Sequence, residues 1–312
     1  RGAIDNTGPR AAALFAGGAL GGGGAPVRRG LRLIVGGDEE TGFECLRYYF
    51  KRHPHPELAF SPDAVFPVVF AEKGILNLTL ALPAPGGHLV RLAGGERPNV
   101  VPDRAEALLA FDSEQQAVEW QRRLISAAAG CRARITVERG GTKTTDTQAS
   151  RLLVRSQGVA THGSTPEKGV NAAAELLVCL VEADRGEGVL DPAGTLAFLG
   201  EAGRGLHGEG LGIFERDDVS GVSSCNLGVL RLQGAEVVAT FDIRYPVSLK
   251  SAEGLVRKVA EKVMAAGGRV MAVTDDPPHY VPEESFLVRT LMEIYRRETG
   301  DDTPPLAIGG GT

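Results

Sequence analysis

The chain has 312 residues, 43% of them hydrophobic, and a formal net charge of -5 at pH 7. This length exceeds the usual size of a single core, so it predicts one large domain or two. Lys and Arg are scattered along the chain, which excludes an extended basic surface and argues against a nucleic-acid partner.

Membrane segments and disulfides are not expected either. No apolar run approaches the roughly 18 residues that a membrane span needs, and the first residues lack the layout of a signal peptide. The four cysteines are widely spaced, which is typical of free thiols in a reducing compartment. We therefore expect a cytoplasmic protein, monomeric or homodimeric, without a membrane partner.

The first part of the chain shows the alternation of helices and apolar strands that is typical of α/β proteins. Small residues at 11–20 predict a buried helix, and the run at 31–35 predicts a strand of a parallel sheet covered on both faces. A helix is predicted at 43–53, where it ends before a pair of prolines.

Three consecutive carboxylates follow the strand predicted at 31–35. Asp38, Glu39 and Glu40 lie in a turn flanked by glycines, where adjacent side chains can converge on one centre. Two interpretations stay open from these residues alone. The cluster either binds a cation, which neutralises the repulsion between the carboxylates, or forms a solvated acidic turn that favours the N-terminus of the next helix.

The pattern changes at Ile75, where leucines begin to alternate with smaller or polar residues up to position 82. This period of two predicts a strand in a more solvated sheet. Further helices are predicted at 113–129, 171–182 and 251–266, and further strands at 134–139, 152–157, 226–232, 236–245 and 269–274. Their order suggests ferredoxin-like units with helices on one face of an antiparallel sheet.

The α/β pattern resumes near residue 280, with a helix at 283–299 and an apolar strand at 306–308. We therefore expect a discontinuous first domain formed by residues 1–74 and 280–312. The second domain, residues 75–279, is expected to be inserted into it.

Two more carboxylates could belong to a metal site. Asp5 and Asp63 each lie in a turn marked by Gly or Pro, and carboxylates from separate strand ends can share a pair of cations. The imidazoles of His53 and His55 have the spacing of paired ligands, but their His-Pro-His-Pro segment is more typical of a solvated loop.

The second predicted domain offers two candidate site residues. His162 stands in a polar, Gly-rich turn, from which an imidazole either reaches into a cleft or stays at the surface. Arg244 ends a predicted strand, where it either clamps a substrate carboxylate or pairs with Asp242. The glycine-rich run at 203–208 matches a dinucleotide-binding pattern, but no helix is expected to begin behind it, so we predict a loop.

Six motifs occur in order along the chain: RGAIDNTGP at 1–9, DEETG at 38–42, FSPD at 60–63, HGS at 162–164, DIRYP at 242–246 and AIGGGT at 307–312. Together they resemble the aminoacylase and carboxypeptidase G2-like clan of co-catalytic zinc peptidases, and most closely its bacterial branch of Xaa-His or carnosinase-like dipeptidases. The resemblance implies an α/β zinc-peptidase catalytic domain, phosphorylase/hydrolase-like, with an inserted α+β ferredoxin-like lid domain. It also implies two zinc ions and hydrolysis of small unblocked dipeptides.

The resemblance assigns roles to individual residues. The implied zinc ligands are carboxylates: Asp5, which bridges the metals, Glu40 and Asp63. The implied catalytic residues are Glu39, as the general base, and His162, which polarises the scissile carbonyl. The residues implied at the substrate carboxylate are Arg244, Gly309, Gly310 and Gly311.

The chain also departs from the pattern of that family. Asn6 and Thr7 replace the usual Asp-Lys pair, and both the upstream H-x-D strand and the histidine after the glycine loop are absent. We therefore expect a fragment of a longer enzyme, inactive by itself and weak in zinc binding because both histidine-bearing segments are missing. Two other functions are compatible with the motifs, an N-acyl-amino-acid deacylase of the same clan and a degenerate homologue without catalytic activity.

Overall fold

The computed structural model describes residues 6–22, 29–38, 42, 44–140 and 150–310. It divides into two compact units. Unit 1 consists of Arg1–Phe70 and Val281–Leu306 with Thr312, and unit 2 of Ala71–Tyr280 and Ala307–Gly311. In the part of the chain that the structure describes, no helix is both long and apolar enough to cross a membrane.

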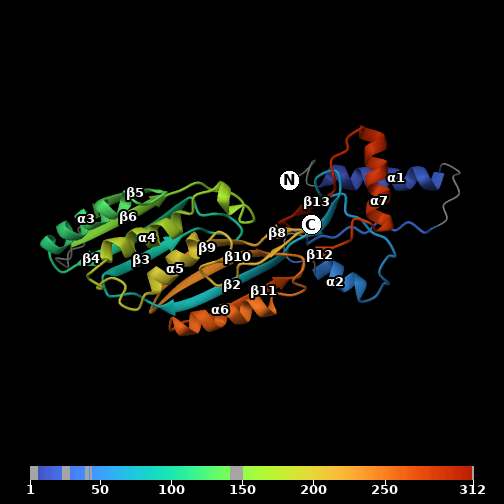
Figure 1. Ribbon diagram of the computed structural model, residues 1–312. Helices are drawn as coiled ribbons and strands as arrows, with labels where there is room; N and C mark the ends of the chain where they lie inside the picture. Colours follow the sequence, from blue (N-terminus) through green and yellow to red (C-terminus); the bar gives the residue numbers. More distant parts are fainter. Residues whose placement is uncertain (1–5, 23–28, 39–41, 43, 141–149, 311–312) are drawn as a thin grey trace. The chain divides into compact units, whose positions relative to one another are not determined.

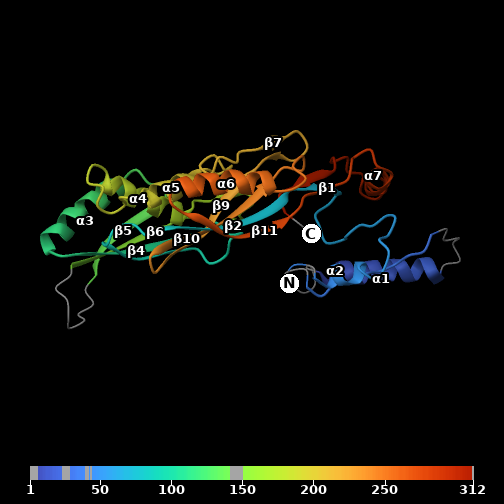
Figure 2. The same cartoon turned by 90° about the horizontal axis from the view of Figure 1, so that it is seen from below.

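Unit 2 is built on an eight-stranded sheet in the order β11-β2-β10-β9-β3-β4-β6-β5, in which neighbouring strands are antiparallel (Figure 1). The strands are β2 (Gly74–Pro83), β3 (Leu89–Gly94), β4 (Arg104–Phe111), β5 (Arg134–Gly140), β6 (Ser150–Gln157), β9 (Ser224–Gln233), β10 (Glu236–Tyr245) and β11 (Arg269–Asp276). Its helices are α3 (Glu114–Ala128), α4 (Ala172–Asp184), α5 (Thr195–Arg204) and α6 (Glu253–Ala265), and they cover one face of this sheet (Figure 2).

Strand β2 shows why the sheet has one covered face. Its leucines, at 76, 78, 80 and 82, are fully buried, whereas Ile75, Asn77 and Thr79 between them are only partly covered. Side chains alternate between the faces of a strand, so all four leucines point towards the helices. Each fully buried leucine contributes about 2 kcal/mol to folding. The strand predicted at 75–82 is confirmed.

Helix α5 packs closely on α4, and the sequence did not predict it. Its start, Gly194, has a φ of 72° and offers no capping side chain, and the helix itself contains two glycines and two alanines. A Cβ atom added at Gly203 would lie 2.9 Å from the Cβ of Ala174 in α4. The glycine that weakens the intrinsic helix propensity is therefore the residue that allows the close packing.

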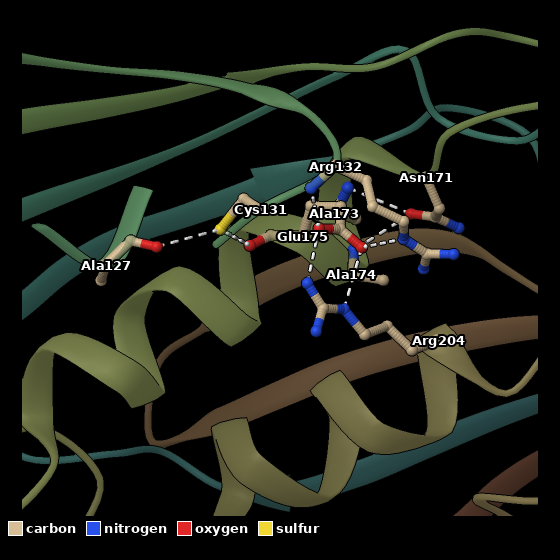
Figure 3. A network of polar contacts seen from close by, with 8 residues as sticks. All are labelled: Ala127, Cys131, Arg132, Asn171, Ala173, Ala174, Glu175 and Arg204. Atoms are coloured by element: carbon tan, nitrogen blue, oxygen red, sulfur yellow. Dashed lines mark hydrogen bonds and ion pairs between the residues drawn. The ribbon is translucent and has the colours of Figure 1, made fainter. Parts of the chain in front are cut away.

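A fully buried carboxylate links α4 and α5 to the segment after α3 (Figure 3). Glu175 accepts hydrogen bonds from Nε of Arg132 at 2.9 Å and from its backbone N–H at 2.7 Å. It also accepts bonds from Nε of Arg204 at 2.9 Å and from Nη2 at 2.6 Å. Burial alone raises the pKa of Glu175, but the bonds from Arg204 and Arg132 outweigh burial and lower the pKa below its ordinary value.

Unit 1 contains three described helices, α1 (Thr7–Gly22), α2 (Glu44–Phe50) and α7 (Phe286–Thr299). Helix α7 is amphipathic, with Val288 and Met292 buried one turn apart. Ser285 caps its N-terminus by accepting from the Val288 N–H at 3.3 Å, so the helix begins three residues later than predicted.

Short strands lie where the chain passes between the units. They are β1 (Val69–Glu72), β12 (His279–Tyr280) and β13 (Leu306–Ile308), in the order β12-β1-β13. Within unit 2 the N–H of Lys73 donates to the carbonyl oxygen of Ile308 at 3.0 Å. This bond fixes the position of the glycine loop that begins at Gly309. A two-stranded ribbon of β7 (Arg216–Asp217) and β8 (Gly221–Val222) completes unit 2.

Two predictions for the first residues are wrong. Residues 31–35 form no strand, and Leu31, Leu33 and Val35 are exposed. Helix α1 exists, but none of its residues is buried, and Phe15 is 76% exposed. An apolar run forms a strand only where a neighbouring strand supplies backbone partners, and the described residues of unit 1 place none beside this segment.

The buried Glu175 generates a test of stability. We expect Glu175→Ala to lower the free energy of unfolding by about 2–3 kcal/mol, because it removes charged hydrogen bonds to two arginines that themselves remain partly exposed. Glu182→Ala is the matched control on the same helix. It removes an ion pair with Arg185 in which both side chains are exposed, and we expect a change of about 0.5 kcal/mol. Urea denaturation measures both.

The same residue makes the stability depend on pH. Because the pKa of Glu175 is lower in the folded than in the unfolded chain, its contribution is present above the unfolded value and is lost as the pH falls through the folded value. Glu175→Gln should therefore lose less stability than the wild type when the pH falls below about 4.5. Equal losses in the two proteins would contradict this role of the charge.

Candidate functional site

The predicted site residues fall into three groups. Asp5, Glu39, Glu40 and Gly311 lie outside the described residues. Asp63 belongs to unit 1. The remaining four belong to unit 2: His162, Arg244, Gly309 and Gly310.

Arg244 is held in place by a carboxylate on its own strand. Asp242 and Arg244 are two positions apart in β10, so both side chains leave the sheet on the face opposite to the helices. Nε of Arg244 donates to Oδ1 of Asp242 at 2.8 Å and Nη2 donates to Oδ2 at 3.0 Å. The ion pair between Arg244 and Asp242, one of the two interpretations that the sequence allowed, is therefore present, and both side chains are buried.

The same guanidinium also contacts the glycine loop. Nη1 of Arg244 donates to the carbonyl oxygen of Gly309 at 3.1 Å. Among the residues that the structure describes, Arg244 thus donates one N–H from each of its three nitrogens, Nε, Nη1 and Nη2. A second N–H on each terminal nitrogen can therefore still donate to an anionic group such as a carboxylate.

His162 lies in a loop whose base is closed by two backbone hydrogen bonds between Val159 and Val170, at 2.9 and 3.0 Å. The N–H of Gly163 donates to the carbonyl oxygen of Asn99 at 2.7 Å. A Cβ atom at Gly163 would lie 3.1 Å from that carbonyl, so the close approach of the two backbones favours glycine. The loop is thus anchored on both sides of an exposed imidazole.

The hydrogen bonds of His162 determine its tautomer. The backbone N–H of Ser164 donates to Nδ1 at 3.2 Å, and Oγ of Ser164 lies 2.7 Å from the same atom. A backbone N–H can only donate, so Nδ1 is an acceptor and the hydroxyl donates to it as well. The proton of the neutral ring is therefore on Nε2, where it can be donated to a carbonyl oxygen.

Ser164 connects the histidine to the glycine loop. A Cβ atom at Gly309 would lie 3.1 Å from the Cβ of Ser164, which places the two residues in contact. A continuous set of contacts therefore runs from His162 through Ser164 and Gly309 to Arg244. Three of the residues predicted from separate motifs thus meet within unit 2, and we name them, with Ser164 and Asp242, the His-Arg cluster.

Two buried oxygens next to this cluster lack a hydrogen-bond partner in the described part of the chain. They are Oγ of Ser224 and Oδ1 of Asn77. Ser224 pairs directly with Arg244 across β9 and β10, and Asn77 pairs with Asp242 across β2 and β10. Directly opposed residues project from the same face, and a buried polar atom without a partner is costly. A polar ligand at this face would find donors and acceptors already in place.

Sequence reasoning missed Ser224 and Asn77, because their relation to Arg244 depends on the register of three strands. The only local signal is that each lies in a segment of alternating residues. Asn77 and Asp242 are 165 positions apart in the sequence and become neighbours only when the strands pair, so spacing in the sequence does not reveal their relation.

The acidic residues of unit 1 have local partners. Nδ2 of Asn6 donates to Oδ2 of Asp63 at 2.5 Å. Asp38 accepts from the N–H of Cys45, in the first turn of α2, at 3.1 and 3.2 Å. The pKa of Asp38 is lowered, chiefly by the side chain of Cys45 and further by this backbone N–H. For Asp38, the interpretation as an acidic residue that favours a helix N-terminus is therefore the one that the structure supports.

The fit of these residues to zinc can be tested only in part. The structure describes one of the three predicted carboxylate ligands, Asp63, and among its described residues no three His, Cys, Asp or Glu side chains are grouped to hold a metal. His53 and His55 stack on Tyr49 and Phe50 with ring centroids 4.4 and 4.3 Å apart, as loop residues that pack on a helix. The described residues alone therefore do not form the predicted zinc site.

The tautomer of His162 gives a direct test of the site geometry. In the neutral ring, Nδ1 of His162 should be unprotonated and Nε2 protonated, as long-range ¹H–¹⁵N correlation spectra report. His88 and His207 serve as internal controls. Their Nδ1 atoms lie 2.9 and 2.8 Å from carbonyl oxygens, which only accept, so both should carry the proton on Nδ1.

Ser164→Ala removes one of the two bonds to Nδ1 of His162. We expect this variant to show a mixture of tautomers at His162 and unchanged spectra for His88 and His207. A wild-type His162 protonated on Nδ1 would contradict the geometry.

Comparison with known proteins finds similarity over the whole chain. The chain is 32% identical over 328 aligned positions to a Bacillus subtilis (strain 168) protein named "Putative dipeptidase YtjP", and the alignment covers 100% of the chain and 65% of that protein. It is 31% identical to a protein of Staphylococcus aureus (strain USA300) with the same description, again over 100% of the chain and 66% of the relative. The chain thus spans slightly less than two thirds of the length of these relatives.

Two further comparisons add little. No model of a known protein family matches the chain. Among solved structures, aminoacylhistidine dipeptidase from Vibrio alginolyticus is 13% identical with a TM-score of 0.37, covering 78% of this chain and 52% of that one. The chain is therefore similar in sequence, along its full length, to bacterial proteins described as dipeptidases.

Proposed function

We propose that the complete protein is a zinc-dependent dipeptidase that hydrolyses the peptide bond of small unblocked dipeptides. The observation that carries the proposal is the His-Arg cluster, which joins a hydrogen-bond donor for a carbonyl oxygen to a cation for a carboxylate. The sequence similarity to bacterial proteins described as dipeptidases supports it independently.

The described residues have distinct tasks in this proposal. Arg244 binds the C-terminal carboxylate of the substrate through its two remaining N–H groups, and Asp242 keeps the guanidinium in position. Gly309 lies against Ser164 without a side chain, so the substrate backbone can approach the loop closely. His162 donates from Nε2 to the scissile carbonyl oxygen and stabilises the negative charge that develops there.

The remaining roles rest on the resemblance of the motifs. We propose that unit 2 is the lid domain and that unit 1 carries Asp5, Glu40 and Asp63 as carboxylate ligands of two zinc ions. When bound, zinc supplies an activated water molecule. Glu39 then acts as the general base that accepts the proton of this water.

The substrate class follows from the clamp at Arg244. The complete protein should hydrolyse dipeptides with free termini, and it should act less on the C-terminal amide of the same dipeptide. Loss of a charged acceptor at Arg244 costs about 1.5–3 kcal/mol, so kcat/KM should fall roughly 10- to 100-fold. Hydrolysis is measured by release of the free amino acid.

N-acyl amino acids are the matched comparison, because they keep the free carboxylate and lack the free amino group. Activity on N-acyl substrates alone would replace the dipeptidase by a deacylase. Peptide binding without turnover of any substrate would instead indicate a homologue that has lost catalysis.

The two adjacent glutamates should respond differently to substitution. Glu39→Gln should keep nearly the full zinc content of the complete protein while turnover falls about 10²- to 10⁴-fold, because a general base contacts the water and not the metal. Glu40→Ala should lose zinc. Metal analysis and dipeptide hydrolysis are measured on the same preparations. If Glu39→Gln lost zinc and Glu40→Ala retained it, the two roles would be exchanged.

A further inference from the structure

Two of the four cysteines lie next to each other in unit 2, away from the His-Arg cluster. Sγ of Cys131, just after α3, lies 3.6 Å from the carbonyl oxygen of Ala127 and 3.7 Å from that of Glu175 (Figure 3). Sγ of Cys179, in α4, lies 3.7 Å from the carbonyl oxygen of Leu124. Both thiols thus lie along the last turns of α3.

Helix geometry explains why these two thiols lie close together. Glu175 and Cys179 are four residues apart, so they lie one above the other on the same face of α4. A helical side chain tilts towards the N-terminal turn, which directs Sγ of Cys179 towards the carbonyl that Cys131 contacts. Consistent with this, the two thiols affect each other's ionisation: the pKa of Cys131 is lowered and that of Cys179 is raised, with the other thiol as the largest cause in each case.

A cavity gives access to one thiol of the pair. It has a volume of about 550 Å³, and its lining includes Cys131, Ser126, Arg123 and Arg204. Cys179 is fully buried and does not line the cavity, whereas Cys131 is partly exposed. A small polar oxidant can therefore reach Cys131 before it can reach Cys179.

We propose that hydrogen peroxide oxidises this pair to a reversible intramolecular disulfide, with Cys131 as the first thiol to react. The Cys131 thiolate attacks one peroxide oxygen, so that an S–O bond forms, the O–O bond breaks, and the leaving hydroxide takes a proton to become water. Sγ of Cys179 then attacks the sulfenic sulfur, so that the S–S bond forms and the S–O bond breaks. The leaving hydroxide takes the Cys179 proton as a second water.

The local electrostatics agree with this order of reaction. The interaction with Cys179 lowers the pKa of Cys131 and Arg204 acts in the same direction; burial, Glu175 and Glu182 act against them, and the net direction is downward. The interaction with Cys131 and burial raise the pKa of Cys179. The thiolate, which is the reactive form towards peroxide, therefore forms at the accessible sulfur.

The other two cysteines differ from this pair and provide controls. Cys225 is buried in β9, and burial raises its pKa. Cys45 belongs to unit 1, where its sulfur accepts from the N–H of Gly37 at 3.4 Å. Neither lines the cavity that Cys131 lines.

The experiment uses the reduced, purified 312-residue chain. It is treated with a small excess of hydrogen peroxide, free thiols are blocked under denaturing conditions, and the digest is analysed by mass spectrometry with and without reductant. We expect loss of two of the four free thiols and one cross-linked peptide pair, Cys131 with Cys179, that disappears on reduction. The same treatment in denaturant should give mixed pairings.

Three variants identify the role of each thiol. Cys179→Ala should accumulate a sulfenic acid at Cys131 that reacts with dimedone, and Cys131→Ala should form no sulfenic acid at Cys179. Cys45→Ala, the control, should still form the cross-link. Prior oxidation of Cys45, or conversion of wild-type Cys131 to sulfinic acid without a cross-link, would overturn the proposal. The wild-type peptide map decides the question even where a variant does not fold.

Discussion

The antiparallel pairing of β10 with both β2 and β9 is the constraint on which the candidate site depends. It buries Phe241, Ile243 and Tyr245 beneath the helices and thereby sends Asp242 and Arg244 to the opposite face. A shift of the register by one residue would exchange these two sets, placing a charged pair in the core and aromatic rings at the site. The apolar face of the strand therefore fixes the direction of the guanidinium.

The elements that the sequence predicted correctly are those whose burial follows a local period. The leucines of β2 repeat every second residue, and the apolar positions of α7 lie one turn apart, so each pattern shows its own buried face. Strand β3 was missed because its register shifts between Leu89 and Arg91, which breaks the alternation. Strand β4 was missed because three of its eight residues are alanine, which is not typical of strands.

The same distinction between local patterns and long-range contacts applies to the candidate site. The motif D-I-R on a strand is local, and it correctly predicted that Asp242 can pair with Arg244. The contact of Gly309 with Ser164 and the positions of Asn77 and Ser224 depend on folding of distant segments, so the spacing of residues could not predict them. The error at residues 31–35 has a related cause, since a strand is defined by its partner as much as by its own composition.

The ion pair between Asp242 and Arg244 has a consequence for the thermodynamics of binding. A free arginine side chain loses about 2 kcal/mol of rotamer entropy when it is fixed in one orientation. Here that loss occurs when the chain folds, because Asp242 and the carbonyl of Gly309 already hold the guanidinium. A ligand carboxylate therefore binds a preorganised donor. Because no further entropy is lost in ordering the arginine, less of the favourable interaction energy is offset on binding.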